Sequence, residues 1–282
     1  MYKLLLVSDQ EDVLEAFARV TTWGFNGFNR PHVRYDLEGA KDSFSKHHAD
    51  GIIIAVSPEK EEELVAFLQE KYPLLPICEA GRTPGEVMEY LAELRQLLNQ
   101  LNADFSSDTF NEQQMMLRAR RYLFRGLVGG RRISCQTLYR EMRLLRSRMD
   151  PNQPCILTEL QQSAVEEDRL VGRWQDGDHL LEKELFQSFG GDVAGFHILP
   201  LVTQDGRIFV LAGALRGQEQ SEDMVAIMNQ RLEDGIRHAE EFRGLHLRVT
   251  GIQVLSSMYA FCSDFTGNRY AARKKQSGTG LQ

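Results

Sequence analysis

The fold is restricted most strongly by two short, wholly apolar runs, each followed by a helical pattern. Residues 4–7 precede helical spacing over residues 12–20, and residues 51–56 precede a helix with an acidic start over residues 59–71. Strands that are apolar on both faces are typical of a parallel sheet covered by helices on both sides. The sequence therefore predicts a doubly wound α/β domain over residues 1–103.

A helical linker is predicted over residues 104–150. No proline occurs between Pro84 and Pro151, and good helix formers dominate residues 110–149. We expect two helices separated at Gly129 and Gly130. Apolar residues recur three, four and seven positions apart on the first helix, a pattern that requires a partner surface, so we expect a homodimer. The candidate dimer interface consists of Met116, Leu117, Leu123, Phe124 and Leu127.

The order of elements changes to β-α-β-β-α-β over residues 151–262. The expected strands are 155–160, 196–202, 207–215 and 247–255, and the expected helices are 178–189 and 221–243. Asp205 and Gly206 favour a tight hairpin between the middle strands. This order is that of the ferredoxin-like α+β fold, an antiparallel sheet with two helices on one face. Residues 263–282 lack apolar periodicity and are expected to be a flexible tail.

Charge and composition argue against several classes of protein. The 282 residues include 33 Lys and Arg against 40 Asp and Glu, and the net charge of −7 does not favour a stand-alone nucleic-acid binder. The cysteines form no C-x-x-C pair, so we expect no zinc site, no disulfide framework and no cofactor. Because no segment approaches the roughly 20 apolar residues that span a bilayer, we expect no membrane association and a cytoplasmic location.

The chain resembles the regulatory portion of YesN-like response regulators of the AraC type. The resemblance is carried by the segments 4–9 (LLLVSD), 50–55 (DGIIIA), 123–130 (LFRGLVGG) and 248–252 (RVTGI). It implies a flavodoxin-like receiver domain, a signalling helix and a degenerate domain of the GGDEF (diguanylate cyclase) type. It also implies an AraC-type DNA-binding module, for which no room is left after residue 275, so we expect DNA binding only through that missing module.

The receiver resemblance implies a degenerate phosphoacceptor pocket. Phosphoryl transfer to aspartate needs acids after the first strand, to hold a divalent cation, and an acceptor aspartate at the end of the third strand. Here Ser8 and Asp9 stand where the family has two acids. Ala55 or a neighbour stands at the acceptor position, where Val56 and Ser57 offer no carboxylate, and Ala80 stands at the position of a hydroxyl. We interpret the domain as a pseudo-receiver that is not phosphorylated.

The cyclase resemblance lacks its catalytic residues. Cyclase chemistry requires acidic metal ligands on the first strand of the domain and a Gly-Gly-acid-acid hairpin. The strand offers Glu159, and the hairpin at residues 204–207 reads QDGR. The triplet Gly190, Gly191 and Asp192 lies between a helix and a strand, where glycine typically ends a helix. We therefore assign no catalytic residue and no metal ligand, and we do not expect an enzyme.

Three hypotheses follow for function. The leading one is a non-enzymatic signalling module in which a partner protein or a small-molecule effector shifts domain packing. A second is a nucleotide-binding or diguanylate-cyclase-like enzyme, which would form a cyclic dinucleotide from GTP and Mg²⁺. A third is nucleic-acid binding through ten arginines between Leu117 and Arg148, where Glu141 is the single acid. The competing interpretation is a solvated helical face whose arginines pair with acidic helices of neighbouring domains.

Overall fold

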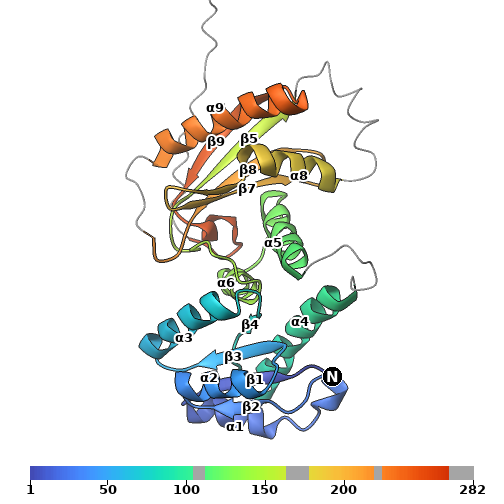
Figure 1. Cartoon of the computed structure of the whole chain (residues 1–282), viewed down its shortest axis with the longest axis vertical. Helices are drawn as coiled ribbons and strands as arrows, with labels where there is room; N and C mark the ends of the chain where they lie inside the picture. The colour runs from blue at the N-terminus through green and yellow to red at the C-terminus, as the bar shows by residue number, and fades with distance from the viewer. Residues whose placement is uncertain (104–111, 163–177, 219–223, 267–282) are drawn as a thin grey trace, which may run out of the picture. The chain divides into compact units, whose positions relative to one another are not determined.

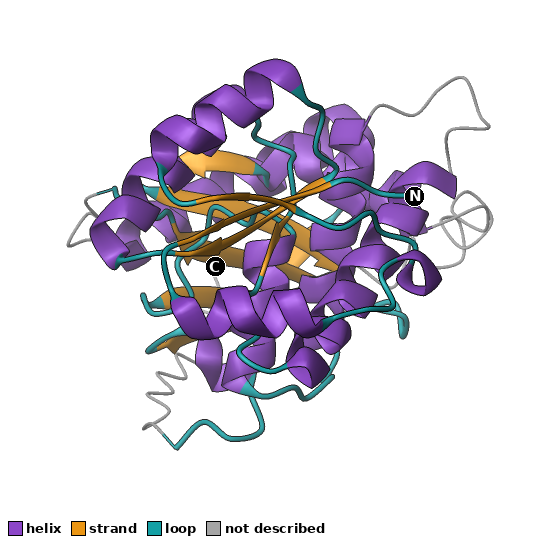
Figure 2. Cartoon of the chain, turned by 90° about the horizontal axis from the view of Figure 1, so that it is seen from below, coloured by secondary structure: helices purple, strands orange, loops and turns teal. Residues whose placement is uncertain are grey.

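The structure is a computed structural model that describes residues 1–103, 112–162, 178–218 and 224–266 (Figure 1). Its internal contacts divide the chain into two compact units. The N-terminal unit comprises residues 1–120 and 139–147, and the C-terminal unit comprises residues 121–138 and 148–282. Both units combine helices with strands (Figures 1 and 2). The chain is therefore a mixed α/β protein, as predicted.

The N-terminal unit contains a four-stranded parallel sheet with the order β2-β1-β3-β4. The strands are β1 (Leu4–Ser8), β2 (His32–Arg34), β3 (Gly51–Ala55) and β4 (Ile77–Cys78). The helices are α1 (Glu11–Arg19), α2 (Leu37–Lys46), α3 (Pro58–Lys71) and α4 (Pro84–Ala103), with a short 3-10 turn, η1 (Gly24–Asn26). Every residue of β1 and β3 is buried, because these two strands form the centre of the sheet.

Helices cover both faces of this parallel sheet. One face packs Leu5 and Ile54 into a core with Ala40 of α2 and Leu64 and Leu68 of α3. The alternate residues of the central strands are also buried, and α1 contacts α4. The wholly apolar composition of β1 and β3 thus reflects burial on both faces, and the predicted parallel arrangement is confirmed.

Two helices follow in the predicted linker, α5 (Glu112–Val128) and α6 (Cys135–Leu144). The expected break at Gly129 and Gly130 is confirmed, and Gly130 has φ +100°, a conformation that L side chains rarely adopt. The linker does not form a unit of its own. Residues 121–138 group with the C-terminal unit and residues 139–147 with the N-terminal unit, while residues 104–111 lie outside the described residues.

The C-terminal unit contains a five-stranded antiparallel sheet with the order β6-β7-β8-β5-β9. Its strands are β5 (Cys155–Gln162), β6 (Gly191–Val193), β7 (Phe196–Val202), β8 (Ile208–Ala214) and β9 (Leu247–Leu255). Its further helices are α8 (Asp178–Phe189), α9 (Met224–Arg243) and a 3-10 turn, η3 (Met258–Phe261). The predicted order is confirmed except for β6, which the sequence analysis missed.

The helices α8 and α9 lie on one face of this sheet (Figure 1). The core between them contains Leu185 and Phe189 of α8, Met228 and Leu232 of α9, and alternate residues of the strands such as Ile198. The hairpin between β7 and β8 is confirmed, since the backbone N–H of Thr203 donates to Arg207 O at 2.9 Å. Only residues 263–266 of the predicted flexible tail belong to the described residues.

No helix in the described residues combines the length and the apolar character needed to cross a membrane.

Candidate functional site

The carboxyl ends of β1, β3 and β4 meet at one edge of the parallel sheet. The chain leaves β1 toward β2 on one side and leaves β3 toward β4 on the other. In open α/β sheets, such a point between two central strands is where ligands commonly bind. Ser8, the last residue of β1, pairs in register with Ala55, the last residue of β3. The structure therefore brings these two predicted pocket residues together at the point where the chain connections diverge between β1 and β3.

Asp9 is engaged by a lysine that the sequence analysis did not identify. Its Oδ2 accepts a hydrogen bond from Lys60 Nζ at 2.7 Å, and both side chains are partly exposed. The hydrogen bond and the charge of Asp9 raise the pKa of Lys60. Lys60 lies in the first turn of α3, in the sequence PEKEEE, and no motif distinguishes it from other surface lysines. The one acid that follows β1 directly is therefore neutralised by an ammonium group.

The end of β3 carries no carboxylate. Ala55 is almost completely buried and presents a methyl group. Ser57 precedes α3 and its side chain makes no capping hydrogen bond. The hydroxyl of Ser8 is fully buried and accepts a local hydrogen bond from the backbone N–H of Gln10 at 3.1 Å. These three predicted pocket residues thus offer hydroxyl and methyl groups where a receiver requires an acceptor acid.

The loop after β4 closes the same edge and contains the fifth predicted residue, Ala80. The next arginine, Arg82, was not predicted as a site residue. Its guanidinium donates to Gln10 Oε1 at 2.7 Å and pairs with Asp12 in the first turn of α1. Its backbone N–H donates to Glu86 Oε2 at 2.8 Å. Arg82 therefore links the loop after β4 to the beginnings of two helices, a role that only the tertiary structure reveals.

Position 81 in this loop requires glycine, because the backbone of Val87 in α4 passes close to it. A Cβ at Gly81 would lie 2.4 Å from the backbone nitrogen of Val87 and 2.9 Å from its Cα. We expect Gly81→Ala to lower the stability of the N-terminal unit by about 1–3 kcal/mol, because the backbone of α4 must move. Gly85→Ala is the matched control, since the nearest atom to its Cβ, Thr83 Oγ1, is 4.0 Å away. Urea unfolding monitored by hydrogen exchange measures the stability of the N-terminal unit in both variants. Equal losses of stability would contradict the role assigned to Gly81.

Arginines of residues 139–147 pair with acids of the N-terminal unit. The guanidinium of Arg143 pairs with Glu61 of α3, and its Nη1 lies 3.7 Å from Oε2 of Glu79, directly after β4. Arg146 donates to Gln69 Oε1 at 3.1 Å. The side chains of Arg143 and Arg146 are largely buried, so they are enclosed within the unit rather than presented to solvent.

Arg140 makes a second such contact. Its Nη2 lies 2.9 Å from Oε1 of Glu93 on α4, and its guanidinium lies 4.5 Å from the centroid of the Tyr90 ring. Burial raises the pKa of Glu93, while the charge of Arg140 acts in the opposite direction. Arg140 and Arg143 therefore pair with acids, as the competing interpretation expects, but their side chains are only 11% and 9% exposed and do not form a solvated face.

The apolar stripe of α5 is largely covered within one chain. Met116, Leu123, Phe124 and Leu127 are at most 2% exposed, whereas Leu117 is 36% exposed. A side chain that is already covered offers no surface to a second copy, so in this structure four of the five residues serve the core. The homodimer itself stays a prediction.

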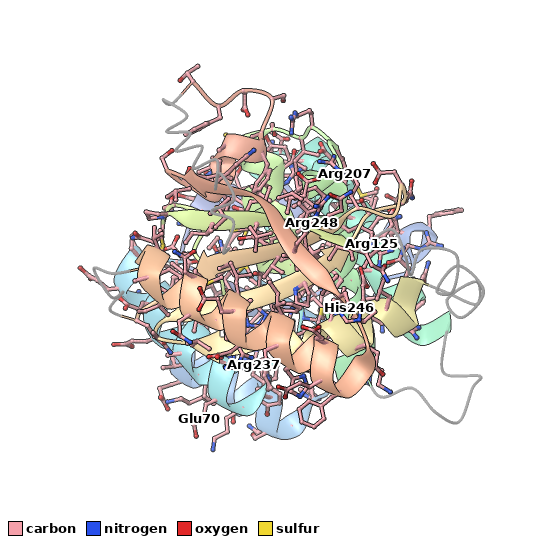
Figure 3. All side chains as sticks on the ribbon, turned by 90° about the horizontal axis from the view of Figure 1, so that it is seen from above. Glu70, Arg125, Arg207, Arg237, His246 and Arg248 are labelled. Atoms are coloured by element: carbon pink, nitrogen blue, oxygen red, sulfur yellow. The ribbon has the colours of Figure 1, made fainter. Side chains whose placement is uncertain are left out.

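Two acids of the C-terminal unit, Glu159 and Asp192, are also paired. Glu159 of β5 accepts two hydrogen bonds from Arg207, at 3.0 Å from Nε and 2.8 Å from Nη2. On the same strand Gln161 accepts from Arg248 of β9 at 2.7 Å; Figure 3 labels both arginines. Asp192 of β6 lies 2.6 Å from both His197 Nδ1 and Arg148 Nη1.

Gly190 ends α8, as predicted. Its backbone N–H donates to Phe186 O at 2.9 Å, and the following Gly191 has φ +117°. The triplet Gly190, Gly191 and Asp192 is therefore a helix end followed by the edge strand β6.

Comparison with protein-family models and with curated protein sequences found no match to this chain. The assignment of function therefore depends on the geometry of the two units.

Proposed function

We propose that the chain is a non-enzymatic signalling module of a bacterial-type transcription regulator, in which a phosphorylation-independent pseudo-receiver is coupled to a degenerate cyclase-like domain. The observation that carries this proposal is the pairing of Ala55 with Ser8 at the sheet edge, beside an Asp9 that is bound by Lys60. Aspartyl phosphorylation needs an acceptor carboxylate and acids that are free to hold a cation. This edge offers a methyl group and an acid that is already paired.

Strand order supports the two fold assignments within the proposal. A parallel sheet ordered β2-β1-β3-β4 with helices on both faces matches the first four strands of the flavodoxin-like arrangement. In the C-terminal unit, the order β7-β8-β5-β9 with two helices on one face matches the ferredoxin-like arrangement, with β6 added at the edge. We therefore assign the N-terminal unit to the receiver-like class and the C-terminal unit to the cyclase-like class.

The pairing of acids favours regulation over catalysis in the cyclase-like unit. Metal-dependent nucleotide chemistry uses carboxylates that are free to ligate the cation. Glu159 accepts from a guanidinium, and Asp192 lies between a histidine and an arginine. These contacts support an input that acts by binding: a partner protein or a small-molecule effector shifts a conformational equilibrium through its different affinity for the two states.

We assign this coupling to the helix α6, one of the segments in which the chain passes from one unit to the other. Its first residues group with the C-terminal unit and the following residues with the N-terminal unit. Arg140 and Arg143 lie in the second part and are held by acids of α3, α4 and the loop after β4. An effector that binds at the sheet edge would act close to these ion pairs, because Glu79 directly follows β4 and Glu61 lies in the first turn of α3, the helix that follows β3.

Treatment with acetyl phosphate and Mg²⁺ is expected to give no stoichiometric acyl phosphate at any aspartate of residues 1–103. Intact mass and borohydride trapping with peptide mapping measure the modification, and a phosphorylatable receiver domain treated in parallel shows that the reagents are active. Asp9→Asn is expected to behave as the unchanged protein does, because Asp9 is not an acceptor in this proposal. Stoichiometric labelling of an aspartate in the unchanged protein would contradict the pseudo-receiver assignment.

A further inference from the structure

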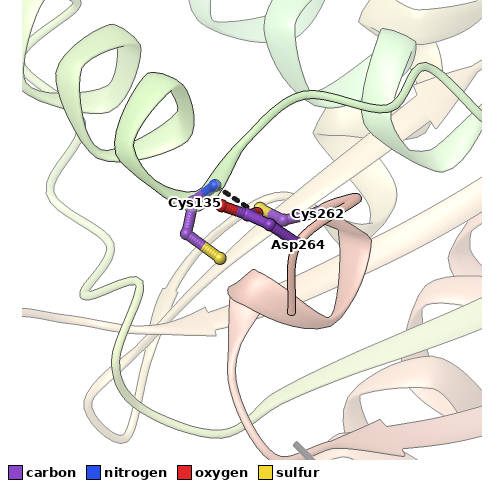
Figure 4. A group of neighbouring side chains, drawn as sticks. All are labelled: Cys135, Cys262 and Asp264. Carbon is purple, nitrogen blue, oxygen red and sulfur yellow. Dashed lines mark hydrogen bonds between the residues drawn. The ribbon is translucent and has the colours of Figure 1, made fainter. Parts of the chain in front are cut away.

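Three possible metal-ligating side chains meet in the C-terminal unit, outside the sheet edge described above. They are Cys135 at the beginning of α6, and Cys262 and Asp264 after η3 (Figure 4). One ligand atom from each, two thiol sulfurs and a carboxylate oxygen, all lie within 4.8 Å of one another. This is the single such group of three among the described residues. Cys262 is buried and Asp264 is exposed, so the cluster opens to solvent on one side.

The cluster is held in place by hydrogen bonds between two distant segments. The backbone N–H of Cys135 donates to Asp264 Oδ1 at 2.8 Å, although 129 positions separate these residues. The backbone N–H of Ser263 donates to Ile133 O at 2.9 Å. At the start of α6, Ser134 Oγ accepts from the backbone N–H of Thr137 at 3.0 Å, which fixes the first turn of the helix. The ligands are therefore positioned before any ion binds.

We propose that Cys135, Cys262 and Asp264 bind one thiophilic divalent cation of the Zn²⁺ class. Zinc takes thiolate and carboxylate ligands in tetrahedral geometry, and a site with three protein ligands keeps a fourth position for water. Thiolate ligands select zinc over magnesium and calcium, which prefer oxygen alone. Binding replaces the two thiol protons, which pass to solvent, so affinity falls as the pH is lowered.

The pKa values of both thiols are raised, which distinguishes the pair from redox-active cysteines. Burial, followed by the neighbouring Cys135, raises the pKa of Cys262 to about 12, and Asp264 adds to this effect. Burial and Asp264 also raise the pKa of Cys135. Redox-active cysteines have lowered pKa values in electropositive surroundings, which is the opposite condition. Arg132 is a positive group that opposes the trend at Cys262, and its guanidinium donates to Phe261 O at 3.3 Å.

Zinc titration of the reduced, metal-free full chain tests this site. We expect one Zn²⁺ per chain, measured by competition with a chromogenic chelator, and a thiolate-to-metal charge-transfer band when Co²⁺ replaces zinc. Cys135→Ser and Cys262→Ser are each expected to weaken binding at least about 100-fold, because loss of a partner outside the ligand set already costs about 10- to 100-fold. Asp264→Asn keeps both sulfurs, so it is expected to retain the charge-transfer band and to weaken binding about 10-fold.

The other two cysteines provide matched controls. Cys78 and Cys155 are buried free thiols outside the cluster, so Cys78→Ala and Cys155→Ala are expected to leave zinc affinity unchanged. Circular dichroism of each variant checks that the fold persists, and the exposed position of Asp264 makes that variant the safest to interpret. The proposal is overturned if the reduced chain takes up no zinc, or if Cys135→Ser and Cys262→Ser bind as tightly as the controls. A Cys135–Cys262 disulfide together with absent zinc uptake would assign the pair to redox chemistry instead.

Discussion

Replacing Glu182 with alanine is expected to lower the unfolding free energy of the C-terminal unit by about 3–5 kcal/mol. The side chain of Glu182 is 1% exposed and lies on α8, where its Oε1 is 2.7 Å from Nη2 of Arg125. The same oxygen accepts a hydrogen bond from the backbone N–H of Val202 at 3.0 Å. Truncation would leave a largely buried guanidinium and a backbone donor without this partner.

The position of Val202 explains why a buried carboxylate is required there. The short strand β6 pairs only with residues 196–198 of β7, so the described sheet has no strand beside Val202 on that side. Glu182 supplies the acceptor that a neighbouring strand would supply. Arg125 of α5, labelled in Figure 3, then balances the charge. One side chain thus connects α5, α8 and the open part of β7.

The exposed pair of Glu159 and Arg207 is the control for this prediction. Their side chains are 37% and 51% exposed, so Glu159→Ala is expected to cost less than about 1 kcal/mol. Urea unfolding, monitored by hydrogen exchange of peptides from the C-terminal unit, measures the unfolding free energy of both variants. If the two substitutions cost the same, the pair of Arg125 and Glu182 would not be buried in solution.

Local sequence pattern predicted the parts of the fold that depend on nearby residues. The wholly apolar β1 and β3, the break at Gly129 and Gly130, and the Asp-Gly hairpin are all local signals. The strand β6 was missed because its three residues are too few to show alternation. Its pairing with β7 comes from a chain reversal in which Ala194 and Gly195 both have positive φ, and apolar spacing does not reveal such a turn.

The candidate sites depend on contacts between distant residues, and the sequence indicated them only in part. Ser8 and Ala55 could be placed together because parallel strands end at a common edge. Lys60 and Arg82 could not, because a lysine or arginine near a helix start is usually a solvated surface residue. The sequence did not indicate the approach of Cys135 to Cys262 either, because the two cysteines lie far apart in the chain. A ligand spacing is visible in the sequence only when the ligands lie on one local element.

Leu123→Ala is expected to lower the unfolding free energy of the C-terminal unit by about 2–5 kcal/mol, because Leu123 is 2% exposed and truncation leaves a cavity. Its neighbour on the stripe, Leu117, is 36% exposed. Leu117→Ala is therefore expected to change stability by no more than about 0.5 kcal/mol. Unfolding measured for both variants separates a core position from a surface position on the same helix.

Sedimentation of Leu123→Ala and of Leu117→Asp tests whether the stripe packs within one chain or joins two copies. If Leu123 packs within one chain, Leu123→Ala reduces stability and leaves the mass of the folded protein unchanged. If the stripe instead joins two copies, Leu123→Ala reduces the sedimenting mass and makes stability depend on protein concentration, since dissociation then accompanies unfolding. Leu117→Asp probes the exposed part of the stripe without opening a core cavity. A loss of mass in Leu117→Asp alone would place a dimer contact at Leu117, beside a stripe that remains part of the core.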